Sequence, residues 1–381
     1  MNQNRIDNLI IKFIEDRISV EESVSLVKWL DKSKENQNYF NGFVGVNYLI
    51  NVDKVYDERK AINKLKVLTN NQKKISTISL IKYAAVAAVA LLISLPFIFN
   101  KDKTQITEPL IVDNNIKVGS DKATLTLDDG NIINLGMGET YLANNLKSNG
   151  KEIVYSPEET QTSRITYHYL TIPRGGQYFV KLSDGTQVWL NSESQLKYPV
   201  SFIEGQPRQV ELVYGEAYFD VSPSTKHNGS KFKVYTDIQE IEVLGTEFNI
   251  SAYEDENAIY TTLVEGKVSV KSGTFSENLI PEQQSNFNRL NKTFKISQVD
   301  IYNQISWRDG VFSFKDKPLK DIMNVLARWY DFKVVFENKD LEKDLFGGAF
   351  SKDQNLNKIL NMIENSNNIN FEISQKTITI K

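Results

Sequence analysis

Apolar residues near the start of the chain recur at intervals of three and four. This period predicts an amphipathic helix whose apolar stripe consists of Ile6, Leu9, Ile10, Phe13 and Ile14. Ser19 and Glu22 have the spacing of a capping box, which predicts a second helix that begins there and runs to Leu30. Two further helices are expected over residues 36–51 and 54–68. Residues 1–74 therefore indicate an all-α bundle.

A long apolar stretch follows this bundle. Residues 83–99 carry no charge, and apolar character reaches back to Ile75 with Lys82 as the one cation of residues 75–99. About 20 apolar residues span a bilayer, so we expect one transmembrane helix over residues 75–99, with a buried core helix as the alternative. Seven cations lie between Arg59 and Lys82, whereas Lys101 and Lys103 alone follow closely, which predicts a cytoplasmic N-terminus.

Beyond a linker at residues 100–119, the apolar period changes to two. Asp-Gly pairs lie between alternating runs at residues 124–135 and 179–190, which predicts two hairpins related as an internal repeat, with Asp129 equivalent to Asp184. Further strands are expected at residues 209–213, 216–221, 240–244, 247–253, 260–264 and 267–271. Residues 120–300 therefore indicate an antiparallel, sandwich-like all-β domain outside the membrane.

The last part of the chain mixes strands and helices. Residues 301–381 predict the order β-α-β-β-α-β, with a helix opened by Pro318 and a closing hairpin over residues 369–381. This order is typical of a split β-α-β module of the ferredoxin-like kind, in which an exposed sheet edge could accept a partner's strand. The expected fold is therefore multidomain: a helical bundle, one transmembrane helix, an all-β domain and an α+β domain.

Composition excludes several kinds of chemistry. Lys and Arg number 45 against 48 Asp and Glu, a net charge of −3, which disfavours direct nucleic-acid binding. The chain has no cysteine and two histidines, so thiolate metal sites and a histidine-rich metal centre are excluded. No phosphate-binding loop motif is present, and we expect no cofactor.

Acidic residues leave a catalytic alternative open. A glycosidase needs two facing carboxylates, and the all-β part offers Asp184, Glu193, Glu211, Glu216 and Asp220. The run Glu254–Glu256 indicates a solvated loop, with calcium binding as the alternative. Surface acids of this kind are common, and no G-x-S-x-G elbow accompanies either histidine, so we expect a protein that is not an enzyme. A membrane-tethered domain that binds or processes glycans stays as the second function class.

Several segments resemble one protein family. They are YLTIPRGGQYFVKLSDGTQVWLNSESQLKYPVSF at residues 169–202, RQVELVYGEAYFDV at 208–221, VLGTEFNISAY at 243–253, TTLVEGKVSV at 261–270, W-x-x-G-x-F at 307–312 and LARWYDF at 326–332. Together they resemble the FecR-type anti-sigma factors common in Bacteroidetes. Residues 18–40 are more loosely similar to the cytoplasmic region of that family.

The resemblance implies a regulator of transcription in the inner membrane. Its cytoplasmic helices would bind an extracytoplasmic-function (ECF) sigma factor, and its periplasmic part would sense the N-terminal signalling domain of an outer-membrane TonB-dependent transporter. Release could involve periplasmic and intramembrane proteases.

Two sets of residues are candidates for these contacts. The sigma-factor set consists of Ile6, Leu9, Phe13, Val24, Val27 and Trp29, for which a place in the core of the bundle is the alternative. The transporter set consists of Gly310, Phe312, Arg328, Trp329 and Tyr330. Trp329 lies off the main apolar stripe of its helix, so we expect it to be exposed.

Overall fold

A computed structural model describes most of the chain beyond the linker and part of the N-terminal region. The described residues are 3–14, 17–30, 32, 33, 36, 40, 116–136, 138–143, 146–156, 165–366 and 369–381. They fall into two compact units, one before residue 115 and one after it. The helices expected at 54–68 and 75–99, most of the helix at 36–51 and the linker up to residue 115 lie outside the described residues.

The first unit contains the two predicted N-terminal helices. Helix α1 covers Gln3–Ile14 and helix α2 covers Val20–Leu30. The capping box is confirmed, because the backbone N–H of Glu22 donates to Ser19 Oγ and that of Ser19 donates to a carboxylate oxygen of Glu22. The apolar stripes meet in one cluster made of Ile6, Leu9, Ile10, Phe13, Leu26, Trp29, Leu30 and Phe40.

Loss of the cap is expected to weaken this helix pair. Ser19→Ala removes the acceptor for the Glu22 N–H and should destabilise the unit by about 1 kcal/mol. Thermal unfolding of the full chain, followed by far-ultraviolet circular dichroism, measures the change. Ser25→Ala is the matched control, since that hydroxyl only donates to the carbonyl of Glu21 within the same helix. Equal stability of the two variants would contradict a stabilising role for the cap.

Within the described ranges, no helix is both long and apolar enough to cross a membrane. The segment at residues 75–99 is not among them, so the single span stays a prediction.

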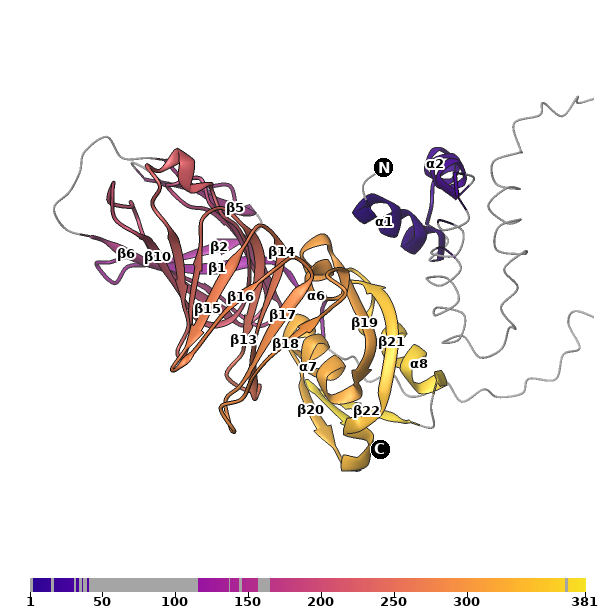
Figure 1. Ribbon diagram of the computed structural model, residues 1–381. Helices are drawn as coiled ribbons and strands as arrows, with labels where there is room; N and C mark the ends of the chain where they lie inside the picture. Colours follow the sequence, from indigo (N-terminus) through magenta and orange to yellow (C-terminus); the bar gives the residue numbers. More distant parts are fainter. Residues whose placement is uncertain are drawn as a thin grey trace, which may run out of the picture. The chain divides into compact units, whose positions relative to one another are not determined.

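Strands dominate the second unit, as the alternating pattern predicts (Figure 1). They form two hydrogen-bonded ladders. In spatial order the first ladder contains β2 (Ile132–Gly136), β1 (Ser120–Thr126), β6 (Tyr167–Ile172), β9 (Ser194–Pro199), part of β10 (Arg208–Asp220), β11 (Phe232–Tyr235), β12 (Glu240–Val243), β15 (Val268–Ser272) and β16 (Phe275–Leu279).

The second ladder shares β10 with the first. It contains β3 (Tyr141–Ala143), β4 (Leu146–Ser148), β5 (Glu152–Tyr155), β7 (Gly176–Lys181), β8 (Gln187–Leu190), the rest of β10, β13 (Glu247–Ala252), β14 (Ala258–Glu265), β17 (Gln283–Asn288) and β18 (Phe294–Gln298). Alternate side chains of both ladders enter one apolar core, which explains why apolar residues recur at every second position along these strands.

The break predicted between the strands at residues 209–213 and 216–221 is wrong. Tyr214 and Gly215 do not separate two strands, because β10 runs through them as one long strand with an irregularity between Leu212 and Tyr214. Up to Tyr214 the strand pairs with β9 and β11, and from Gly215 onward it pairs with β13 and then β8. Gly215 has φ +93°, and a Cβ there would lie 2.2 Å from Ser194 Oγ. The glycine permits this close approach where the strand passes from one ladder to the other.

The two predicted Asp-Gly hairpins are confirmed. Strands β1 and β2 pair around Asp129-Gly130, and β7 and β8 pair around Asp184-Gly185. Both aspartates accept the backbone N–H two residues later, at 2.9 Å in each turn. The repeat therefore extends to turn geometry.

The C-terminal part has the predicted order of elements. It contains β19 (Val311–Pro318), α7 (Leu319–Tyr330), β20 (Lys333–Phe336), β21 (Leu345–Ser351), α8 (Leu356–Ser366), β22 (Phe371–Ser374) and β23 (Thr377–Ile380). The prediction of a ferredoxin-like module with one sheet is wrong, however. Among the described residues, β19 pairs only with β21, and β20, β23 and β22 form a separate sheet. A register shift between Phe314 and Lys317 interrupts the β19–β21 ladder. Both helices and both sheets share one apolar core.

Candidate functional site

The candidate site is the contact between the second ladder and the C-terminal part, here called the junction. The polar outer face of the ladder includes Glu216 on β10, Asn249 and Ser251 on β13, and Tyr260 on β14. Helix α6 (Tyr302–Ile305), the short helix η2 (Ser306–Asp309), β19 and α7 contribute the opposite side. The junction thus joins residues far apart in sequence.

Arg328, near the C-terminus of α7, is the main charged contact. Its guanidinium donates to Glu256 at 2.8 Å and to Asp255 at 2.5 Å, and it stacks on the ring of Tyr253 at 3.6 Å. Burial opposes the charge, yet Tyr253 and the carboxylates outweigh this and raise the pKa of Arg328. An arginine in this setting is permanently charged and fixes the orientation of α7 on the ladder.

A backbone contact reinforces the arginine. The N–H of Gly175, in the turn before β7, donates to the carbonyl of Arg328 at 2.7 Å. The neighbouring Arg174 donates to Glu193 at 2.7 Å and to the carbonyl of Phe332 at 2.9 Å. The Arg174-Gly175-Gly176 stretch is therefore a turn that holds the end of α7.

Trp329 packs on the other side of the junction. Its ring lies against Gly119, where a Cβ would approach the ring to 2.7 Å, so no larger residue fits at that position without a shift. Its indole N–H donates to the carbonyl of Lys352 at 2.9 Å. The linker predicted to extend to residue 119 is therefore packed over its last residues, and Ile116 also contacts the C-terminal core.

Lys352 is a buried cation beside this tryptophan. Its Nζ lies 3.7 Å from the centre of the Trp329 ring and donates to Gln177 on β7 at 2.8 Å. Burial lowers the pKa of Lys352 to about 7, although the carboxylates of Glu216, Asp121 and Asp353 act in the opposite direction. The junction thus contains a lysine whose charge changes near neutral pH.

A cavity of about 330 Å³, here called the junction cavity, lies between the two parts. Glu216 lines it and accepts hydrogen bonds from the amides of Asn191 at 2.8 Å and Asn249 at 2.9 Å. Burial raises the pKa of Glu216 despite these two donors. The cavity therefore has a polar floor of carboxylate and amide groups.

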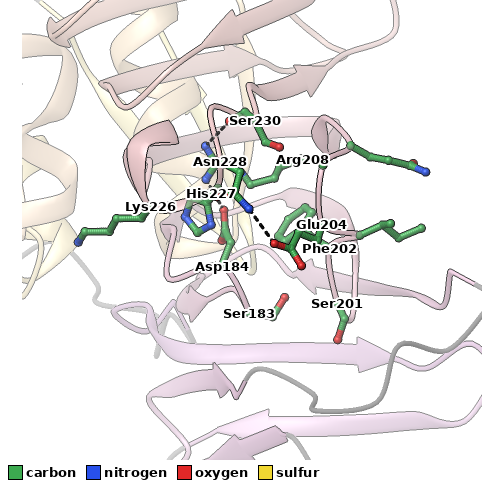
Figure 2. Close-up of a pocket in the computed structure, with 13 residues that line it drawn as sticks. Ser183, Asp184, Ser201, Phe202, Glu204, Arg208, Lys226, His227, Asn228 and Ser230 are labelled. Atoms are coloured by element: carbon green, nitrogen blue, oxygen red, sulfur yellow. Dashed lines mark hydrogen bonds and ion pairs between the residues drawn. The ribbon is translucent and has the colours of Figure 1, made fainter.

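A second cavity, of about 400 Å³, lies within the β ladders (Figure 2). Figure 2 shows the carboxylate of Asp184 directed toward Arg208 beside His227, with Lys226 pointing away from the pocket. Arg208 donates to Asp184 at 2.7 Å and to the carbonyl of Ser222 at 2.9 Å. Both charged side chains are 2% exposed, so removal of either partner would leave a buried charge unpaired.

The acids considered for a glycosidase are all held by other side chains. Asp184 and Glu216 are paired as described, Glu193 binds Arg174, Glu211 binds Lys197 at 3.3 Å, and Asp220 accepts from Gln187 at 3.1 Å. Asp255 and Glu256, considered for calcium, bind Arg328. Across the part of the chain that the structure describes, no group of three metal-ligating side chains is present.

Comparison with known families identifies the chain. A family model described as FecR protein matches residues 168–269, and one described as FecR, C-terminal, matches residues 311–380. The chain is a FecR-type protein. The C-terminal match begins at the first residue of β19 and ends at the last residue of β23.

Solved structures agree with this assignment. Two crystal structures of a candidate anti-sigma factor from Parabacteroides distasonis ATCC 8503, at 1.65 and 2.50 Å resolution, are each 27% identical to the chain with a TM-score of 0.52. Each match covers 56% of this chain and 98% of the other chain. No curated protein matches the chain. The family and these structures together support an anti-sigma factor role for this FecR-type protein.

The structure places the residues predicted for transporter contact inside the junction and the C-terminal core. The expectation that Trp329 is exposed is wrong, because it is 4% exposed between Gly119 and Lys352. The reason is that α7 buries two faces, one on its own sheets and one on the β ladder. Phe312, Arg328 and Tyr330 are likewise buried, and Gly310 forms the turn before β19 with φ +80°. Their role in transporter contact stays a prediction.

The residues predicted for sigma-factor contact divide into two groups. Ile6, Leu9, Phe13 and Trp29 are buried in the core between α1 and α2, whereas Val24 and Val27 are half-buried on α2. Val27 packs partly against that core, while Val24 is not part of it. Val24 is therefore the half-buried member of the set that does not pack against the described helix core.

Sequence reasoning missed the partners of Arg328 and the burial of Lys352. The solvated loop expected at Glu254–Glu256 is exposed at Glu254 and Asp255, but Asp255 and Glu256 also bind the arginine of α7. The sequence does contain one signal for this contact. It has an acidic run in one domain, and in another domain a helix with a cation beside an aromatic residue. Charge complementarity alone does not determine which residues pair, so the sequence does not predict this contact.

Proposed function

We propose that this FecR-type protein is a single-pass inner-membrane anti-sigma factor. Its N-terminal helices bind an ECF sigma factor in the cytoplasm. Its β-rich and C-terminal parts lie in the periplasm and receive a signal from the N-terminal domain of an outer-membrane TonB-dependent transporter. Proteolysis of the periplasmic part and then of the span releases the sigma factor.

The observation that carries the proposal is the pair of FecR matches, together with the similarity to the anti-sigma factor structures. The order of parts in the chain supports it. A helix pair precedes the apolar segment 75–99, and the FecR regions follow it. The excess of cations before that segment supports a cytoplasmic location of the helices.

Strand addition provides a physical route for the incoming signal. In the three-stranded sheet, β20 and β22 are the outer strands, and each has one side that pairs with no other described strand. Val335 on β20 is 45% exposed, so an added strand would also cover apolar surface. This supports the C-terminal part as the place where the transporter domain docks.

Sigma-factor binding is expected to depend on the accessible side of α2. Val24→Asp places a charge on this side without entering the core and should weaken capture of the sigma factor at least tenfold, since a buried apolar contact becomes an unpaired charge. The full chain in detergent serves as bait for the ECF sigma factor whose gene lies nearest. Binding is quantified by titration.

Phe13→Asp and Lys28→Asp are the comparison variants. Phe13 is buried in the helix core, so its variant should lose both helical structure and binding, whereas Lys28 is exposed on α2. Lys28→Asp controls for added negative charge on the same helix. Undiminished binding by a folded Val24→Asp variant would rule out this face. No binding by the folded wild type would refute the anti-sigma proposal.

A further inference from the structure

Two neutral polar groups of residues that line the junction cavity lack hydrogen-bond partners among the described residues, and the Nε atom of Arg328 lacks one as well. Asn249, on β13, is 3% exposed, and its amide donates to Glu216, but its Oδ1 atom has no partner among the described residues. Trp307, in η2, is 7% exposed, and its indole N–H also has no partner in the described part of the chain. Buried polar groups without partners are costly and uncommon, so each requires an explanation.

These two groups belong to opposite sides of the junction. Asn249 belongs to the β ladder, whereas Trp307 belongs to the segment that leads into the C-terminal part, and both line the cavity. One group is an acceptor and the other a donor. A hydroxyl group satisfies either kind, because it donates one hydrogen bond and accepts others. A ligand rich in hydroxyl groups would therefore complete both.

Charge argues against an ionic ligand. Glu216 accepts hydrogen bonds from two amides, and two nitrogens of Arg328 donate to Asp255 and Glu256, while its Nε lies 3.6 Å from a carboxylate oxygen of Glu193. At the same cavity, Lys317 and Asp321 contribute one charge of each sign. The lining therefore carries charges of both signs and no excess of positive charge, which favours an uncharged ligand over an anion.

Aromatic rings provide the apolar part of the lining. Five aromatic side chains line the cavity: Tyr253, Tyr260, Trp307, Phe312 and Phe314. At about 330 Å³ it falls within the size range of small-molecule sites. Saccharides combine hydroxyl groups with apolar C–H faces, and this lining offers partners for both.

We propose that the junction cavity is a binding site for a small uncharged saccharide, a mono- or disaccharide. Because the β ladder and the C-terminal part both line the cavity, a bound sugar stabilises their contact. This goes beyond the proposed function, since neither sigma-factor binding nor strand addition by a transporter domain requires a ligand.

Binding is tested on the full chain in a detergent without a sugar headgroup. The probes are glucose, galactose, N-acetylglucosamine, maltose, lactose and chitobiose, and the readouts are calorimetric titration and the thermal unfolding midpoint. At least one probe should bind the wild type and raise that midpoint. Failure of all six to bind would overturn the proposal and would leave water as the occupant of the cavity.

Three variants locate the site. Trp307→Phe keeps the ring but loses the N–H, and should weaken binding about tenfold. Ser251→Phe fills the cavity next to Glu216 and Tyr260, its neighbours across the ladder, and should abolish binding. Phe275→Leu is the control, because Phe275 stacks on Phe294 and is not part of the cavity lining.

The pattern across the variants decides the outcome. Binding that is equal in wild type, Trp307→Phe and Ser251→Phe would place the sugar elsewhere and refute this site. The sigma-factor titration is independent of all three variants, so failure here is distinguishable from failure of the proposed function.

Discussion

Arg208→Leu is expected to destabilise the β-rich part by about 3–5 kcal/mol, because it leaves a buried carboxylate without its cation. Asp184 is 2% exposed and keeps only the two hydrogen bonds from Thr186. The substitution also removes the donor to the carbonyls of Ser222 and Ser230, which lie in different segments. Urea unfolding of the full chain, followed by tryptophan fluorescence, measures the loss.

A double variant separates the charge from the packing. Asp184→Asn combined with Arg208→Leu keeps an acceptor for the Thr186 N–H and removes the buried charge, so it should recover part of the lost stability. Lys197→Leu is the control, since that lysine forms its ion pair with Glu211 at a partly exposed position. A loss below about 1 kcal/mol for Arg208→Leu would show that the pair does not hold these segments together.

Features that depend on residues close in sequence could be predicted. The capping box at Ser19 and Glu22, the two Asp-Gly turns and the helix that follows Pro318 each depend on a few neighbouring residues, and all are present. The predicted β-rich character is confirmed for the same reason, since alternation is a local property. Local patterns do not predict the structure where one residue type is common in two different settings. Glycine is typical of turns, but Gly215 permits close packing within a continuous strand.

The junction could not be predicted, because its partners are distant in sequence. Arg328 and Asp255 are 73 residues apart, and Lys352 and Gln177 are 175 residues apart. Nothing in the pattern of α7 distinguishes a second buried face from an exposed one. Trp329 and Arg328 lie off its main stripe, where an exposed pair would also lie. Only the fold shows that this face is covered.

Lys352→Met is expected to remove a pH dependence of stability that the wild type shows between pH 7 and 9. In the unfolded chain a lysine has its ordinary pKa of about 10.4, whereas burial lowers the pKa of Lys352 to about 7 in the folded protein. Between these values the unfolded state binds one more proton than the folded state. The free energy of unfolding therefore rises with pH, by at most about 1.4 kcal/mol per unit.

Below pH 7 both states are protonated at this lysine, so its contribution to the slope disappears. The buried histidines and tyrosines do not titrate in the folded protein in this pH range. Burial lowers the pKa of His168 and His227 and raises that of Tyr253 and Tyr330, so none of these titrates in the folded state between pH 7 and 9. Methionine has a similar volume and fills the space over Trp329 without a charge. Chemical unfolding of the full chain at several pH values in this range gives the slope.

Lys358→Met on α8 is the matched control, because that lysine is exposed and its loss should leave the slope unchanged. If Lys352→Met retains the wild-type slope, the lysine keeps its charge in the folded protein and the junction does not respond to pH through it. If the slope disappears in that variant alone, the strength of the contact between the β ladder and the C-terminal part depends on one proton at Lys352. Acidification then weakens the junction, because charging Lys352 costs more inside the fold than in water.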